Sequence, residues 1–576
     1  MYNYMCKTPK GAKSMRNKIL SVIALLLVVA LSVPILTACD FQGLESVFEL
    51  LEMPTETDGE DSTKPAPTKR PSKKDDNDDD DEDENEDETV FETGDVSETQ
   101  RNDEESTPEI EDDDRVEVFP STVDRQYYDK EFYLSILPDT NPMAYFWVEK
   151  SEGDAMSEAI YARQEKVYNY LGVEIVGSSA GNYSTYVGPF KNAVEKRDGS
   201  VDCLLSHAQI GVGGFVQGMY LADFNELPGV DLEADYWNTE FMDTLAIDGS
   251  RYLGFSDFNI LYTYVLAFNK EMMNHYAGDM EKTPYQLVED YEWTLDIMLD
   301  LVKLVSKDAT GDGKTADDTY GLTGQQWTPF IGFMHASNIN LVEQNEEGDY
   351  ELAMMNEVNA EKTKLLTEKL KDLSMSQYAF LEYPQGTISP VQVPLTSGRA
   401  LMQITSTYSL NGLLSYDIDF GVLPYPMFNV SQKEVGYRSL QWGGYICVPS
   451  YVNNPKMVGE TLEVLSFYSD DVQKVFRQEV LGRPLSEAPE DAKMLDEYIW
   501  NNVCIDFGQA YGDITGALYF FPKVTRAEED GGQPLASYYA SIKTSSNKKL
   551  KKFISDVRRN KTQLENNESE TSTETE

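Results

Sequence analysis

A run of acidic residues early in the chain limits where a folded core can form. Twelve of the fourteen residues from Asp75 to Glu88 are Asp or Glu, and the other two are Asn. A segment with so many like charges and so few apolar side chains cannot bury enough apolar surface to offset its conformational entropy. We therefore expect a solvated, disordered spacer here and a folded body after it.

The whole chain is acidic, but its charge is unevenly distributed. Of 576 residues, 100 are Asp or Glu and 48 are Lys or Arg, which gives a net charge of −52. Residues 54–114 hold 27 acidic and 6 basic residues, and so carry −21 of that charge. Such a balance argues against a nucleic-acid partner, because neutralising phosphates requires clustered Lys and Arg.

The segment before the spacer has the features of a secretory signal. Arg16 and Lys18 precede an apolar run over residues 19–36, and small residues then lead to Cys39. The stretch Leu36-Thr-Ala-Cys39 resembles the lipobox of bacterial lipoproteins. The resemblance implies that residues 1–38 are a signal peptide and that Cys39 carries the lipid, including a palmitate, at the start of a tether over 39–120. A plain transmembrane anchor is the alternative, since 18 apolar residues nearly span a bilayer.

Three cysteines follow Cys39, and an odd number leaves at least one of them unpaired. Cys203 and Cys447 lie in apolar runs that read as strands, and Cys504 lies near the end of the body. Buried free thiols are the expected state, with one disulfide as the alternative.

The folded body opens with a strand, a helix and a second strand. Residues 131–137 form the first apolar run, and a helical pattern follows between Asp154, as N-cap, and Gly172, as C-cap. Residues 173–176 read as the next strand, and residues 261–268 are apolar on both faces. This alternation predicts an α/β fold with mainly parallel sheets flanked by helices.

A series of short motifs runs through residues 130–556 in a fixed order. It includes Gly153-Asp154 with Glu158-Ala-Ile-Tyr-Ala-Arg163, Leu221-Ala-Asp-Phe-Asn-Glu-Leu-Pro228, Ala267-Phe-Asn-Lys270, Tyr291-Glu-Trp-Thr-Leu-Asp296 and Asp419-Phe-Gly-Val-Leu-Pro-Tyr-Pro426. Together these motifs resemble the family 1 extracellular solute-binding proteins of sugar-type ABC importers, whose best-known fold is that of maltose-binding protein.

The resemblance implies a two-lobed, periplasmic-binding-protein-like fold of type II, with the lobes joined by hinge crossings. We expect crossings near residues 262–264 and 442–445. The implied boundaries are a bilobal domain over 121–559, a first lobe over 125–262 and 444–496, a second lobe over 263–441 and 497–556, and a disordered tail over 560–576.

The resemblance also implies a function. The chain would capture a carbohydrate, expected to be an oligosaccharide, or another small solute, and deliver it to the transmembrane subunits of an ABC permease. It would be a monomer without cofactor or enzymatic activity, held by lipid on the outer face of the cell membrane of a Gram-positive bacterium. An exported glycan-active enzyme is one alternative, since paired carboxylates need not be close in sequence. A sensory or structural lipoprotein that keeps the fold is another.

Candidate ligand residues follow from the chemistry of sugars, which offer C–H faces to aromatic rings and hydroxyl groups to polar side chains. For each ring, ordinary core packing is the alternative. The residues we favour are Trp442 and Tyr445 at the second crossing, Tyr264 at the first, Tyr408 where the family presents an aromatic platform, and His207 and Gln209 after a strand, with Trp327 and Asp257 as weaker choices.

One loop resembles a calcium-binding loop. Asp308, Thr310 and Asp312 stand at positions 1, 3 and 5, a Gly follows at position 6, and Asp318 lies beside position 12. Position 12 itself is Thr rather than the usual bidentate Glu. A weak structural calcium site is one interpretation, and a solvated acidic turn is the other.

Overall fold

The computed structural model describes residues 127–128, 130–138, 142–305, 307–309, 311, 313–382, 395–416, 418–481 and 487–573. All of them lie in one compact unit, Glu109–Glu576. The signal-like segment, Cys39 and the acidic spacer lie outside the described residues. In the described part of the chain, no helix combines the length and the apolar character needed to cross a membrane.

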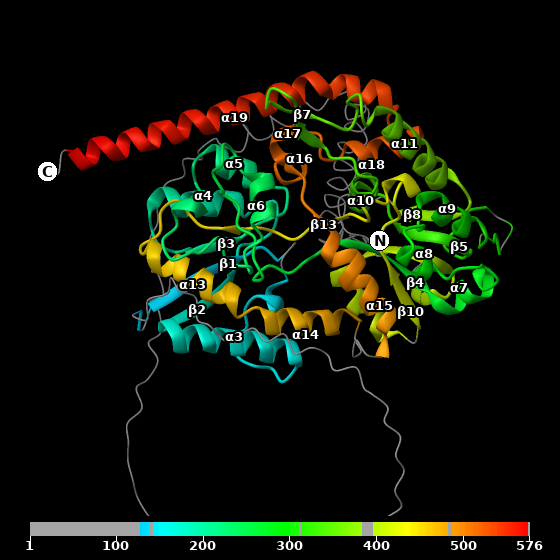
Figure 1. The fold of residues 1–576 in the computed structure, drawn as a ribbon, viewed down its shortest axis with the longest axis horizontal. Coiled ribbons are helices and arrows are strands. Elements are labelled where there is room, and N and C mark those ends of the chain that lie inside the picture. The colour runs from blue at the N-terminus through cyan, green and yellow to red at the C-terminus, as the bar shows by residue number, and fades with distance from the viewer. Residues whose placement is uncertain are drawn as a thin grey trace, which may run out of the picture. The chain divides into compact units, whose positions relative to one another are not determined.

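The first sheet has the strand order β12-β3-β1-β2 (Figure 1). Its central strand β1 (Lys130–Ile136) runs parallel to both β2 (Val173–Ser179) and β3 (Cys203–Leu205). The last strand, β12 (Ile446–Cys447), returns from far along the chain and pairs antiparallel with β3. Cys203 and Cys447 are buried free thiols on these neighbouring strands, as expected.

Helices cover both faces of this sheet and complete the first lobe (Figure 1). The helix predicted between Asp154 and Gly172 is α3 (Ala155–Leu171). Its N-cap carboxylate accepts a hydrogen bond from Ser157 N, and Gly172 closes it in the left-handed region at φ 75°. The remaining helices of the lobe are α4 (Val187–Lys196), α5 (Val212–Gln217), α6 (Thr239–Leu245), α13 (Pro455–Phe467) and α14 (Asp470–Leu481).

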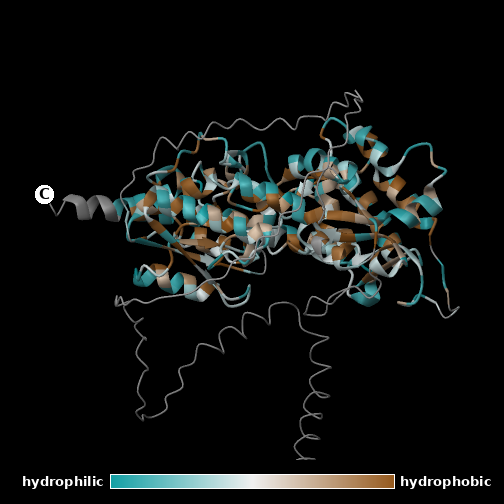
Figure 2. Ribbon diagram, turned by 90° about the horizontal axis from the view of Figure 1, so that it is seen from below, coloured by the Kyte–Doolittle hydropathy of each residue, from teal (hydrophilic) through white to brown (hydrophobic). Residues whose placement is uncertain are grey.

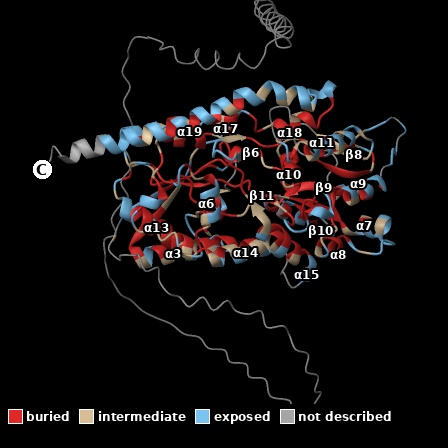
Figure 3. Ribbon diagram, turned by 45° about the horizontal axis from the view of Figure 1, so that its top comes forward, coloured by how far each residue is buried: buried red, intermediate tan, exposed pale blue. Residues whose placement is uncertain are grey.

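The second sheet has the order β10-β4-β9-β5-β8 and is mixed rather than mainly parallel. The strands β5, β8 and β9 are parallel to one another, whereas β4 is antiparallel to both of its neighbours. Figures 2 and 3 show that the strands of the body are largely hydrophobic and buried. The strand bounds are β4 (Tyr264–Asn269), β5 (Tyr320–Gln325), β8 (Ala379–Glu382), β9 (Ala400–Ser406) and β10 (Phe420–Leu423).

Helices flank the second sheet and complete the second lobe, which also carries a small hairpin. The helices are α7 (Lys270–Ala277), α8 (Pro284–Glu289), α9 (Leu295–Lys303), α10 (Thr328–Ala336), α11 (Ala360–Met375), α12 (Thr407–Leu410) and α18 (Phe520–Val524), and the hairpin strands are β6 (Val342–Gln344) and β7 (Tyr350–Leu352). Two short helices, α16 (Phe507–Ala510) and α17 (Gly512–Thr515), precede α18 in the sequence.

Three crossing segments lie side by side between the two sheets. The short strand β11 (Ser439–Leu440) pairs in parallel with β13 (Val503–Cys504). The residues after β11 also bond to the first crossing, because Trp442 N donates to the carbonyl of Tyr262 over 2.7 Å. These backbone bonds join the two expected crossings to each other and to a third one near residue 503.

The chain returns to the second lobe earlier than the expected boundary at residue 496. The helix α15 (Pro489–Lys493) carries Asp491, whose side chain is fully buried against the second sheet. Its carboxylate accepts hydrogen bonds from Lys270 Nζ at 2.8 Å, Tyr285 Oη at 2.6 Å and Val422 N at 2.9 Å. All three donors belong to the second lobe, so α15 does too.

The sequence predicts a disordered tail from residue 560, but residues 560–573 instead continue the long helix α19 (Leu535–Thr573). This helix runs over both lobes in Figure 1. Arg558 pairs with Asp248, and Asn560 Nδ2 donates to the carbonyl of Gln217 over 2.7 Å. These contacts hold the helix against the first lobe as far as Asn560, where the charged and polar sequence predicts the start of a disordered tail.

We predict that replacing Asp491 with Ala lowers the free energy of unfolding by about 3 kcal/mol, because it leaves a lysine, a phenol and a backbone amide without their buried acceptor. Urea unfolding of the purified protein measures the loss. Asp419 is the matched control, since it faces the same Lys270 over 3.8 Å but is 65% exposed. Its Ala variant should lose less than about 1 kcal/mol, and equal losses in the two variants would contradict the prediction.

Candidate functional site

The predicted ligand residues lie mainly where strands of the two sheets end. His207 and Gln209 follow β3, Trp327 follows β5, and Tyr408 follows β9. In open α/β sheets, ligands bind outside the carboxyl ends of the strands. Both sheets therefore place predicted ligand residues at the carboxyl ends of their strands, and the crossing segments lie between the two sheets.

A line of aromatic rings follows the crossing segments. Its ring centroids are 5.4 Å apart for Trp442 and Tyr264, and 6.3 Å apart for Tyr264 and Tyr262. From Tyr262 the line continues over 6.1 Å to Tyr408 and over a further 5.8 Å to Tyr145. All four distances lie in the range of contacting aromatic pairs. The line therefore runs without a break from the crossings into the first lobe.

Three rings of this line were predicted and two were not. Trp442, Tyr264 and Tyr408 were chosen from the sequence, whereas Tyr262 and Tyr145 were missed. Trp442 is only 7% exposed and Tyr145 9%, but Tyr408 is 41% exposed, so the line is most accessible near its first-lobe end, at Tyr408.

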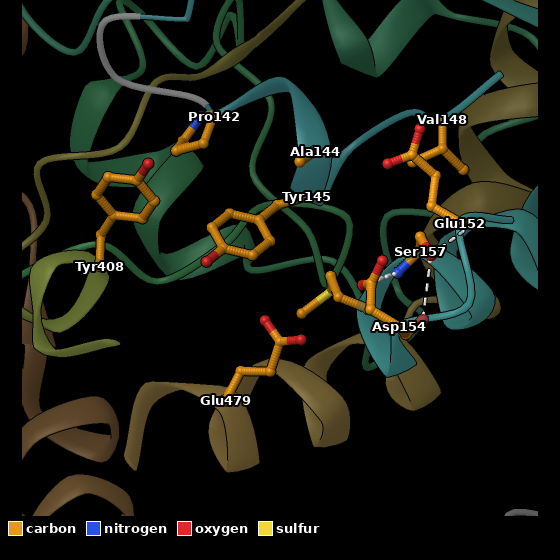
Figure 4. A pocket seen from close by; sticks show the side chains of 10 residues that line it. Pro142, Ala144, Tyr145, Val148, Glu152, Asp154, Ser157, Tyr408 and Glu479 are labelled. Carbon is orange, nitrogen blue, oxygen red and sulfur yellow. Dashed lines mark hydrogen bonds between the residues drawn. The ribbon is translucent and has the colours of Figure 1, made fainter. Parts of the chain in front are cut away.

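A pocket of about 230 Å³ opens at that end of the line (Figure 4). Tyr408 comes from the second lobe, and the other residues of its lining come from the first. In Figure 4 the rings of Tyr145 and Tyr408 lie near each other, and Glu479 points up from α14 toward Tyr145. The lining residues are Pro142, Ala144, Tyr145, Val148, Glu152, Asp154, Met156, Ser157, Tyr408 and Glu479.

The polar part of the pocket is acidic. Glu152, Asp154 and Glu479 are its charged lining residues, and the lining contains no Lys or Arg. A backbone hydrogen bond from Ser157 lowers the pKa of Asp154, so this carboxylate stays ionised. Burial, together with the negative charge of Asp154, raises the pKa of Glu479. The pocket thus offers hydrogen-bond acceptors and repels anions.

His207 shapes the turn that follows β3. Its Nδ1 atom accepts hydrogen bonds from Gln209 N at 3.0 Å and from Ile210 N at 3.3 Å. Burial lowers the pKa of His207 to about 4, so the imidazole is neutral at physiological pH. The side chain of Gln209 is 1% exposed, and its Nε2 has no hydrogen-bond partner among the described residues. His207 is therefore a structural acceptor, and Gln209 holds a buried donor beside it.

Tyr445 connects the second crossing to the end of β3. Its carbonyl accepts from Ser206 N at 3.0 Å, and its own amide donates to Ser206 Oγ at 3.3 Å. The ring is 3% exposed. Tyr445 thus contributes mainly to the placement of the crossing.

The two weaker choices have packing partners of their own. Trp327 stacks on Tyr519 at 4.3 Å, with the guanidinium of Arg526 5.5 Å from the Trp327 ring centroid. Asp257 is half-buried, and its carbonyl accepts from Gln473 Nε2 at 2.7 Å. The residue that borders the aromatic line is the next one, Thr328, whose hydroxyl lies 3.0 Å from Tyr264 Oη.

Two of the four predicted calcium ligands, Thr310 and Asp312, lie outside the described residues. Asp308 accepts from Gly311 N at 2.6 Å, and Asp318 accepts from Ala309 N at 2.8 Å and from Thr315 N at 2.9 Å. Both carboxylates therefore hold the turn itself. Within the described ranges, no group of three or more His, Cys, Asp or Glu is placed to hold a metal ion. Calcium binding here stays a prediction.

The sequence signals for the missed residues differ in kind. Tyr145 lies shortly after β1, so the strand-end rule that selected His207 applies to it as well. Tyr262 belongs to a predicted crossing. Glu479 lies on α14, more than three hundred residues after Tyr145, and only the folded chain brings the two together.

No protein-family model matches the sequence. No curated protein matches it either.

Several solved structures are similar to this one. An ABC substrate-binding protein from Listeria monocytogenes, in complex with cycloalternan, has a TM-score of 0.46 and 15% identity over 75% of this chain and 99% of its own. The GacH receptor of Streptomyces glaucescens, studied with acarbose, has a TM-score of 0.49 and 16% identity over 74% and 99%. An ABC transporter solute binding protein from Thermotoga lettingae, bound with α-D-tagatose, has a TM-score of 0.46 and 15% identity over 73% and 100%.

We predict that His207 makes the protein less stable as the pH falls from about 6.5 to about 4. The unfolded chain takes up a proton near pH 6.5, whereas the buried imidazole does so only near pH 4. The wild type should lose about 2 kcal/mol at pH 5 through this group. In His207→Asn, where Asn Oδ1 can replace Nδ1 as acceptor, this part of the loss should vanish.

Urea unfolding at pH 7.5 and pH 5 measures the difference. His275→Asn is the control, since His275 is exposed, and it should keep the pH dependence of the wild type. An unchanged pH dependence in His207→Asn would contradict the assignment.

Proposed function

We propose that this chain is a receptor that binds a carbohydrate between its two lobes and delivers it to an ABC importer. The observation that carries the proposal is the line of rings along the crossings, which ends in a pocket where Tyr145 and Tyr408 come from different lobes. Sugar rings pack their C–H faces on aromatic rings, and their hydroxyl groups bond to polar side chains. The site supplies both kinds of partner.

The chemistry of the site favours a neutral oligosaccharide. Glu152, Asp154 and Glu479 accept hydrogen bonds from hydroxyl groups, and the lining has no basic residue to compensate a ligand carboxylate or sulfate. Tyr408, which is 41% exposed, offers its ring to a sugar, and Tyr145 and Tyr262 lie on either side of it. A ligand that contacts rings of both lobes stabilises the closed form, so binding shifts the population toward closure.

The anchor and the location are part of the proposal and rest on the sequence. A basic stretch, an apolar run and the lipobox-like residues before Cys39 support export and lipidation. The acidic spacer would then separate the body from the outer face of a Gram-positive membrane. At that position, the receptor reaches the permease subunits while it stays attached to the cell.

We predict that neutral oligosaccharides raise the melting temperature of the purified protein and that anionic ones do not. Differential scanning calorimetry with maltotetraose, cellotetraose, xylotetraose and tetragalacturonate tests this. A ligand at one hundred times its Kd adds about 2.7 kcal/mol to the free energy of unfolding. Sugars are recovered intact from a receptor, whereas shortened products would indicate an enzyme. A response to tetragalacturonate alone would contradict the neutral ligand class.

We also predict that Tyr408→Ala weakens sugar binding at least tenfold, a loss of about 1.4 kcal/mol. The variant removes the second-lobe ring of the pocket while the lining of the first lobe stays in place. Isothermal titration calorimetry with the best neutral sugar measures the change. Tyr416→Ala is the matched control, since Tyr416 is 57% exposed, close in sequence and outside the pocket lining. If the two variants bind equally well, Tyr408 does not contact the ligand.

A further inference from the structure

A basic residue occupies a core position of α3. The buried apolar residues of this helix, Met156, Ile160, Val167 and Leu171, form one stripe at helical spacing. Arg163 stands in the same stripe and is 1% exposed. A position with this pattern would ordinarily hold an aliphatic side chain.

The guanidinium group of Arg163 contacts three segments of the first lobe. Its Nη2 donates to the carbonyl of Phe146 over 2.8 Å, and its Nη1 donates to Ser469 Oγ over 2.9 Å. The group also lies 4.7 Å from the centroid of the Phe258 ring. Its Nε has no hydrogen-bond partner among the described residues.

The charge of Arg163 is not balanced by a carboxylate. The ion pairs found within the described part of the chain do not include it. Burial alone lowers the pKa of Arg163, to about 9. Burying an unpaired charge is costly, and apolar residues of similar volume often replace buried charges without loss of stability. Stability of the core therefore gives no reason for an arginine here.

The two hydrogen bonds of Arg163 do give a reason, because each joins a wall of the pocket. Phe146 directly follows Tyr145 in the chain. Ser469 directly precedes α14, the helix that carries Glu479. Arg163 itself lies six residues after Ser157 on α3, and Ser157 is also in the pocket lining. One guanidinium thus ties together the three elements that form the first-lobe side of the pocket.

Other contacts also hold this wall, since the ring of Tyr145 packs edge-on against Phe476 of α14 with centroids 5.3 Å apart. The polar contacts of the neighbouring residues lie further along the chain. Gln164 makes a reciprocal pair with the backbone of Val148, at 3.0 Å and 2.9 Å. The indole of Trp147 donates to the carbonyl of Ile175 over 2.9 Å. Both contacts hold residues 147 and 148, whereas Arg163 binds the carbonyl of Phe146, the residue next to Tyr145.

We propose that Arg163 is a positioning residue that keeps Tyr145 and Glu479 in place on the first-lobe wall of the pocket. The proposal rests on the proposed function in one respect, namely that the pocket binds a sugar. Holding a pocket wall with a planar, multidentate donor preorganises the site for its ligand.

The test uses the full chain and the variants Arg163→Met and Arg163→Lys. We expect Arg163→Met to keep a melting temperature within a few degrees of the wild type while amide hydrogen exchange rises at least tenfold in residues 143–148. Binding of the neutral tetrasaccharides should weaken at least tenfold when measured well below the melting temperature. Arg163→Lys retains a charge and can reach only one acceptor at a time, so both effects should be intermediate.

Lys166→Met is the matched control. Lys166 lies on the same helix and pairs with Asp471 of α14 over 3.1 Å, but both side chains are exposed. This variant should change neither exchange nor affinity. If Arg163→Met does not fold, the same comparison is made with Arg163→Lys.

The possible outcomes separate the two proposals. Unchanged exchange in residues 143–148, or unchanged affinity, would overturn the role of Arg163. A fall in melting temperature with exchange raised throughout the first lobe would show a purely structural role and would also overturn it. If the wild type binds none of the sugars, the proposed function fails, and the exchange measurement still decides what Arg163 holds.

Discussion

Hydrogen bonds between three crossing segments hold the aromatic line of the site in place. Gln441 N donates to the carbonyl of Cys504 over 2.9 Å, and Thr263 Oγ1 donates to the carbonyl of Leu440 over the same distance. With the bond from Trp442 to Tyr262, these contacts align the crossings in one narrow layer. Every second side chain of an extended segment lies on the same face of that layer. This arrangement brings the rings of Trp442 and Tyr262 within reach of Tyr264.

The same layer also sets the edges of both sheets. Ser206 links the end of β3 to Tyr445, and Thr407 N donates to the carbonyl of Thr263 over 2.9 Å at the end of β9. Each sheet therefore ends at a crossing segment rather than at a free loop. The second-lobe ring of the pocket, Tyr408, thus follows a strand end that is held by a backbone bond, which gives it a defined position.

Local signals predicted much of this arrangement, and non-local contacts explain the rest. The ends of α3 follow from Asp154 and Gly172 because caps act within one turn, and both are confirmed. The rings at the crossings follow from their position in the motif order. Arg163 cannot be assigned from sequence, since its meaning depends on Ser469, three hundred residues away. The helical residues 560–573 of α19 were also missed, because an acidic and polar sequence without apolar periodicity predicts a disordered tail.

The long helix α19 constrains how two such lobes can move. At one end Tyr538 stacks on Phe520 of the second lobe with ring centroids 5.8 Å apart. At the other end Arg558 pairs with Asp248 of the first lobe, and both side chains are at least half exposed. A continuous helix does not stretch. A rotation of the lobes about the crossings therefore either leaves the distance between these two contacts unchanged or separates one of them. Exposed ion pairs contribute only about 0–1 kcal/mol, whereas the stacked rings are largely buried. The ion pair does not act alone, however, because Gln217 of the first lobe also bonds to Asp556 and Asn560, and Phe553 and Val557 are only 1% and 2% exposed. Both ends of α19 are therefore anchored by more than surface contacts, and a rotation that keeps both ends in place is favoured.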